Sequence, residues 1–157
     1  MSHTFRQSLD NHSAPNRKFE TALNQGKVTA TDLTVEKVGV SARQIDYRFS
    51  ETKSPQEASD VADNLVRRVD YLLEPLAIIE HDPSGPQIQI RSQKPSSDGQ
   101  TQRYYEMNVD RDGISIERYA ASSGVREQDE IHLTRESFER LCHDLDEAST
   151  PTAKTKR

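Results

Sequence analysis

Residues 54–73, SPQEASDVADNLVRRVDYLL, decide the fold class of this chain. Ser54 can cap a helix, Pro55 suits the first helical position, and Glu57 completes a capping box. Pro75 cannot continue a helix. The apolar residues recur three or four positions apart, which is typical of an amphipathic helix; they are Ala58, Val61, Ala62, Leu65, Val69, Leu72 and Leu73. The segment therefore predicts a long helix that buries one face against another layer.

Short alternating segments on both sides of this helix predict the second layer. Val, Ile and aromatic residues alternate with polar ones, as in half-buried strands. The expected strands are 33–40, with an irregularity at Glu36-Lys37, then 45–49, 76–81, 87–91, 105–109, 114–117 and 131–133. Short turns join most of them, and such turns pair neighbouring strands antiparallel.

Two further helices are predicted outside the central one. Thr134 can cap a C-terminal helix, whose apolar stripe holds Phe138, Leu141, Cys142 and Leu145. A short helix is expected over Pro15–Gln25, with Gly26 as its stop. We therefore predict an α+β fold in which the central and C-terminal helices cover one face of an antiparallel sheet of about five to seven strands.

The length of 157 residues suits one domain. We expect a single α+β domain over residues 15–147, a disordered N-terminal tail over residues 1–14, and a disordered basic tail over residues 148–157. Residues 1–18 carry about +2 and residues 148–157 carry +3, so the net charge of −5 leaves about −10 for the rest of the chain. An acidic body disfavours broad contact with a phosphate backbone.

The polar sheet face supplies the candidate binding residues, which are Arg91, Arg103, Tyr104, Arg118 and Tyr119. Arginine and tyrosine are enriched in protein interfaces and among their hot spots. The same residue types also stack single-stranded bases. Glu106 and Glu117 lie among them and would repel phosphates.

Other motifs point to structure rather than to chemistry. The segment Asn108–Gly113 matches the first six positions of a calcium loop, but position 12 is Tyr119, and a hairpin turn explains the same residues. His132, Cys142 and His143 lack the spacing of a zinc site. No catalytic residue, metal or cofactor is predicted.

The number of cysteines and the hydropathy of the chain indicate the cellular location to expect. A single cysteine permits no internal disulfide, which favours a reducing compartment and a cytoplasmic location. No apolar run approaches the roughly 20 residues of a membrane span, so no membrane association is expected.

These observations favour a non-catalytic protein-interaction module, such as an adaptor, a chaperone-like protein or a regulatory subunit. Its contact surface would be the polar sheet face and the acidic C-terminal third. The partner would be another protein or a second copy of the chain, because exposed sheet edges must be paired or covered. Single-stranded nucleic-acid binding through the Arg/Tyr residues is the alternative, and an enzyme with an unrecognised pocket is a minor one.

Overall fold

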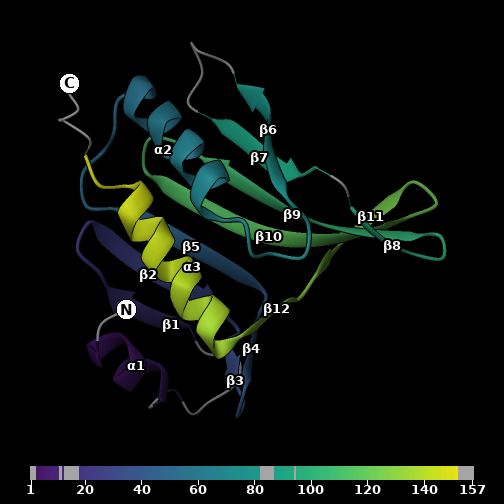
Figure 1. The fold of residues 1–157 in the computed structure, drawn as a ribbon, viewed down its shortest axis with the longest axis horizontal. Coiled ribbons are helices and arrows are strands. Elements are labelled where there is room, and N and C mark those ends of the chain that lie inside the picture. Colours follow the sequence, from purple (N-terminus) through teal and green to yellow (C-terminus); the bar gives the residue numbers. More distant parts are fainter. Residues whose placement is uncertain (1–2, 11, 13–17, 82–86, 94, 152–157) are drawn as a thin grey trace.

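A large antiparallel sheet with helices on one side organises the chain (Figure 1). The computed structural model describes residues 3–10, 12, 18–81, 87–93 and 95–151. Its large sheet follows the order β1-β2-β5-β10-β9-β7-β6, with β11 beside β10 and β8 beside β9. These strands are β1 (Phe19–Ala22), β2 (Gly26–Thr31), β5 (Gln44–Phe49), β6 (Leu76–His81), β7 (Ile88–Ser92), β8 (Ser96–Asp98), β9 (Thr101–Val109), β10 (Gly113–Ser122) and β11 (Val125–Asp129).

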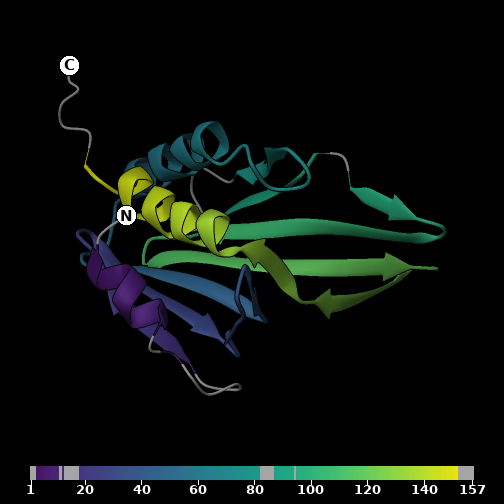
Figure 2. The ribbon, with the colours of Figure 1, turned by 60° about the horizontal axis from the view of Figure 1, so that its bottom comes forward.

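A small antiparallel sheet lies beside the large one. Its order is β12-β4-β3, built from β12 (Ile131–Thr134), β4 (Gly39–Ala42) and β3 (Thr34–Val35). The helices are α1 (His3–Asp10), α2 (Pro55–Arg68) and α3 (Arg135–Ala148). The α+β prediction is confirmed, and Figure 2 shows α2 and α3 side by side on one face of the sheet.

Helix α2 forms as its sequence predicts, although it is shorter. The Ser54 hydroxyl accepts a hydrogen bond from the Glu57 amide at 3.1 Å, and the Glu57 carboxylate accepts one from the Ser54 amide at 2.8 Å. Ala58, Val61, Ala62 and Leu65 are buried. The helix ends at Arg68, and the amide of its C-cap, Val69, donates to the Leu65 carbonyl. Beyond it, Glu74 is buried against Arg118, whereas Leu73 is 78% exposed.

Helix α3 closes the core from the same side. The Thr134 hydroxyl accepts a hydrogen bond from the Ser137 amide at 3.0 Å and caps the helix, as predicted. Phe138, Leu141, Cys142 and Leu145 are fully buried. They belong to the same buried cluster as the inward-facing side chains of the sheet, which include Ile45, Tyr47, Met107 and Ile116.

The N-terminal third differs from the prediction in two places. Of the short helix expected over Pro15–Gln25, residues 15–17 lie outside the described residues. For the rest the prediction is wrong, because residues 19–22 form β1, which pairs with β2 and places Phe19 beside Ala30. The single strand expected over 33–40 is two short strands, β3 and β4. The Glu36 amide donates to the Gly39 carbonyl, so the irregularity expected at Glu36-Lys37 is a complete turn.

The chain ends also differ from the expected tails. Residues 3–10 form helix α1, because Phe5 and Leu9, four positions apart, insert into the core. Helix α3 reaches Ala148, and Ser149 is buried. Residues 1–2, 11, 13–14 and 152–157 of the expected tails lie outside the described residues. No helix in the described part of the chain is long and apolar enough to cross a membrane.

Strands β9 and β10 continue beyond the two covering helices and form an arm with β8 and β11 (Figures 1 and 2). We define the arm as residues 96–105 and 118–129. No strand was predicted over β8 or β11. In the structure β11 pairs with residues 118–122 of β10, and β8 pairs with residues 101–103 of β9. The arm is thus a short four-stranded sheet that the helices leave uncovered.

Candidate interaction face

The face of the large sheet that points away from α2 and α3 is here called the outer face. Strand register determines which side chains it carries, because successive residues of a strand point to opposite faces. Tyr104 lies opposite Tyr119 and Glu106 opposite Glu117, and both pairs belong to the outer face. Arg91 of β7 lies beside Glu106 on the same face.

An Arg–Tyr cluster, formed by Arg91, Tyr104, Glu106, Tyr119 and Arg126, occupies the outer face at the base of the arm. The two tyrosine rings are 5.9 Å apart, with an interplanar angle of 32°. The Arg91 guanidinium lies 5.3 Å from the centre of the Tyr104 ring, and that of Arg126 lies 3.8 Å from the centre of the Tyr119 ring. Both guanidiniums thus lie at cation–π distance from a tyrosine ring.

Glu106 holds this cluster together. One of its carboxylate oxygens accepts hydrogen bonds from Arg91 at 3.3 Å and from Arg126 at 3.1 Å. The Glu106 side chain is only 6% exposed, whereas those of Arg91 and Arg126 are 35% and 44% exposed. A buried carboxylate requires such partners. The cluster therefore presents ordered arginines to solvent above a neutralised carboxylate.

A second carboxylate orders the adjacent part of the face. The Tyr119 hydroxyl donates to Glu117 at 3.0 Å, and the Gln128 amide donates to the other oxygen of Glu117 at 3.2 Å. Burial and the hydrogen bond to Glu117 raise the pKa of Tyr119, so its phenol stays protonated. The hydrogen bond to Tyr104 and the nearby Glu106 raise the pKa of Arg126.

Three of the five predicted site residues, Arg91, Tyr104 and Tyr119, come together in this cluster. Arg103 and Arg118 do not join them, because each directly precedes a tyrosine in its strand and therefore points to the opposite face. Arg103 forms an ion pair with Asp129 at 3.4 Å. Sequence reasoning missed Arg126, because Val125–Asp129 has one apolar residue followed by four polar ones and so lacks the alternation that predicts a strand.

Arg118 instead belongs to a buried polar network on the helix-covered face. Its guanidinium donates to both oxygens of Glu74, at 3.1 and 3.2 Å, and lies 4.4 Å from the centre of the Tyr105 ring. Ser92 and Ser96 also donate to the Glu74 carboxylate. This network ties the end of the α2–β6 connection to β7, β8 and β10, and so fixes the base of the arm.

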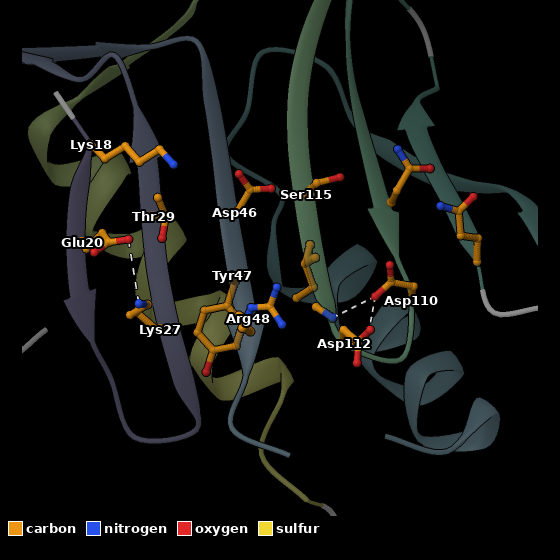
Figure 3. A pocket seen from close by; sticks show the side chains of 14 residues that line it. Lys18, Glu20, Lys27, Thr29, Asp46, Tyr47, Arg48, Asp110, Asp112 and Ser115 are labelled. Carbon is orange, nitrogen blue, oxygen red and sulfur yellow. Dashed lines mark hydrogen bonds and ion pairs between the residues drawn. The ribbon is translucent and has the colours of Figure 1, made fainter. Parts of the chain in front are cut away.

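A hollow of about 390 Å³ lies at the other end of the outer face (Figure 3). Its floor includes Gly113, where an added Cβ would lie 2.3 Å from the Tyr47 carbonyl oxygen. Lys27 pairs with Glu20 at 3.8 Å, and Asp46 accepts from Gln44. Arg48, which also lines the hollow, has no ion-pair partner among the described residues.

The segment Asn108–Gly113, weighed above as a calcium loop, forms the β9–β10 turn beside this hollow. One Asp110 oxygen accepts from the backbone amides of Asp112 and Gly113, at 2.8 and 2.9 Å. The carboxylate is thus engaged by its own turn. Among the described residues, no group of three or more His, Cys, Asp or Glu side chains is placed to hold a metal ion.

Most carboxylates of the acidic C-terminal third are engaged inside the molecule. Asp146 accepts from the Tyr47 hydroxyl at 2.5 Å and from the Gln25 amide at 2.7 Å. Glu127 and Glu136 have no partner among the described residues. The remaining ion pairs are Asp129–Arg103, Glu139–Arg6, Asp144–Arg68, Asp144–Arg140 and Glu147–Arg68, and Glu130 lies 3.5 Å from the His132 ring.

No protein-family model, curated protein or solved structure matches this chain.

Proposed function

We propose that this chain is a non-catalytic protein-interaction module, an adaptor, chaperone-like protein or regulatory subunit, that binds another polypeptide through its outer face. The observation that supports this proposal is the Arg–Tyr cluster at the base of an arm that no helix covers. Tyrosine and arginine are enriched among interface hot spots. The cluster places two of each around Glu106.

The order of the cluster strengthens the proposal. Long arginine side chains lose conformational entropy when a partner fixes them. Here the Arg91 and Arg126 guanidiniums are held by Glu106 and by the tyrosine rings before any partner binds. A partner would therefore meet a surface whose side chains are already ordered.

The same geometry weighs against single-stranded nucleic acid as the partner. A base must stack on a free aromatic face, but Arg91 and Arg126 lie over the Tyr104 and Tyr119 rings. Glu106 and Glu117 add negative charge beside them, and Arg103 and Arg118 point to the other side of the sheet. The acidic C-terminal third is not part of the proposed binding surface, because most of its carboxylates have partners within the chain. A cytoplasmic location remains part of the proposal, on the basis of the single cysteine.

Site-specific photo-crosslinking in cells tests the proposal. A photoreactive amino acid at Gln102, which is exposed on the outer face of the arm, should give a discrete protein adduct. The matched control is the same amino acid at Glu127, which is exposed on the opposite face of the arm. Arg126→Glu should abolish the Gln102 adduct, whereas Lys27→Glu, in the distant hollow, should leave it intact.

The outcomes separate the alternatives. An adduct of twice the chain mass identifies the partner as a second copy, and an adduct of another mass identifies a different protein. Absence of an adduct at Gln102, or equal adducts at Gln102 and Glu127, would contradict the proposal. An adduct that nuclease digestion removes would replace it with nucleic-acid binding.

A further inference from the structure

Helix α1 docks on the rest of the molecule through two apolar anchors, Phe5 and Leu9. Phe5 is 1% exposed, and its ring lies 5.7 Å from the Phe19 ring and 6.0 Å from the Phe138 ring. Leu9, one turn later, is completely buried. The α1 seat, which we define by β1, the first half of α3 and Leu33, thus receives two anchors at positions i and i+4.

Two ion pairs on the rim of the seat determine the direction of the helix. Arg6 donates to Glu139 at 2.9 Å, and Arg135 donates to Asp10. Glu139 and Arg135 both lie on α3, one turn apart. Arg6, directly after the first anchor, therefore pairs with Glu139, and Asp10, directly after the second anchor, pairs with Arg135. A helix docked in the reverse direction would place like charges together.

We propose that the α1 seat is a helix-docking site, and that a partner protein with an amphipathic helix of the same pattern displaces α1 and binds there. The pattern is an aromatic anchor, a basic residue directly after it, an aliphatic anchor four positions after the first, and an acidic residue directly after that. Docking of an amphipathic helix by anchors at i and i+4 is a common mode of peptide recognition. Another helix with these four side chains can make the same ring contacts and ion pairs.

The test uses the full chain with its own anchors removed, Phe5→Asp with Leu9→Asp, and a fluorescent peptide with the sequence of residues 2–12, SHTFRQSLDNH. The peptide should bind this variant saturably in an anisotropy titration. It should bind the unaltered chain at least about tenfold more weakly, because α1 competes at the high effective concentration of a tethered segment. A peptide with Phe5→Ala and Leu9→Ala is the matched control and should not bind.

Charge reversal tests the direction of docking. Glu139→Arg in the anchor-free chain should weaken binding of the peptide several-fold, and a peptide with Arg6→Glu should restore it. Equal binding of the anchor and control peptides, or no binding to a folded anchor-free chain, would overturn the proposal. Loss of the circular dichroism of the folded state in that chain would do the same, because α1 would then be an inseparable part of the core.

Hydrogen exchange on the unaltered chain provides an independent measurement. If α1 leaves its seat, its amides exchange through local opening and should exchange at least about 100-fold faster than those of α3. Equal protection in the two helices would show that α1 opens only when the whole domain unfolds, and the seat would then be inaccessible to a partner.

Discussion

Replacing Arg118 by methionine removes one half of the ion pair that fixes the base of the arm. Glu74 would then remain buried, with only the Ser92 and Ser96 hydroxyls as partners. The side chains of Arg118 and Glu74 are 6% and 2% exposed, and both guanidinium nitrogens of the pair donate to carboxylate oxygens. The variant therefore leaves a buried charge without its counter-ion.

The expected loss in the free energy of unfolding is large. Removal of one partner from a buried pair costs about 3–5 kcal/mol, which is a major share of the roughly 5–15 kcal/mol that stabilises a typical domain. Glu74→Leu should cost a similar amount, because it leaves the Arg118 charge buried. The double variant should recover most of the loss, because replacing both members of a buried pair by apolar groups is often nearly neutral.

Equilibrium unfolding in urea measures these differences. With a slope of about 2 kcal/mol per molar urea, each single variant should lower the midpoint by about 1.5–2.5 M. Glu20→Gln is the control, because it removes an exposed pair with Lys27 at 3.8 Å and should cost less than about 1 kcal/mol. Single variants that unfold at the midpoint of the unaltered chain would refute the reasoning. A double variant whose loss of stability equals the sum of the two single losses would refute it as well.

The pH dependence of the folding stability provides a second check on the Glu74–Arg118 pair. Burial alone would raise the pKa of Glu74, but hydrogen bonds from Arg118, Ser96 and Ser92 outweigh it and lower that pKa. A carboxylate with a lowered folded-state pKa contributes stability above its unfolded pKa of about 4.3, and this contribution is lost as the pH falls through the folded value. The stability difference between the unaltered chain and Glu74→Gln should therefore be full at pH 7 and shrink below about pH 4.

Three further predictions follow from other buried contacts. Tyr47→Phe removes a 2.5 Å hydrogen bond to the Asp146 carboxylate and should cost about 1.5–3 kcal/mol in urea unfolding, so an unchanged midpoint would contradict it. Burial raises the pKa of the Cys142 thiol. A thiol reagent should therefore modify it at least about 100-fold more slowly in the native protein than in denaturant. Rapid labelling of the native protein would show that α3 opens readily. Gly113→Ala places a methyl group against the Tyr47 carbonyl and should cost about 1–3 kcal/mol in thermal unfolding, whereas Ser115→Ala on the same strand should cost little.

The parts of the fold that local sequence determines could be predicted. The capping box of α2, the Thr134 cap of α3 and the alternation in β9 and β10 each depend on residues within a few positions of one another. Helix α1 could not be predicted in this way, because eight residues are too few to form a stable helix alone. It forms because the Phe5 ring packs against the rings of Phe19 and Phe138, and Leu9 is buried with it, so the contact joins distant parts of the sequence.

The candidate site was predictable only in part, for two different reasons. Residues 103 and 104 are adjacent in a strand, and adjacent side chains of a strand point to opposite faces of the sheet. The sequence alone therefore separates Arg103 from Tyr104, and the prediction that both belong to one site was avoidable. The burial of Arg118 has another origin, because its partner Glu74 lies 44 positions earlier in the chain. Only the tertiary structure brings these two charges together.

Arg118 and Arg126 allow the stability of the arm to be separated from its proposed function. A sheet that no helix covers cannot be stabilised by apolar burial on both faces, and here polar contacts replace it, with Glu74–Arg118 on one face and Glu106–Arg126 on the other. Arg118 is buried, so its loss should destabilise the domain. Arg126 is 44% exposed, and Arg91 still donates to the buried Glu106 carboxylate when Arg126 is removed, so the loss of Arg126 should cost less stability than the loss of Arg118. If the outer face binds a partner, Arg126→Ala should reduce binding in a protein that remains folded, whereas Arg118→Met should reduce binding only as far as it unfolds the arm.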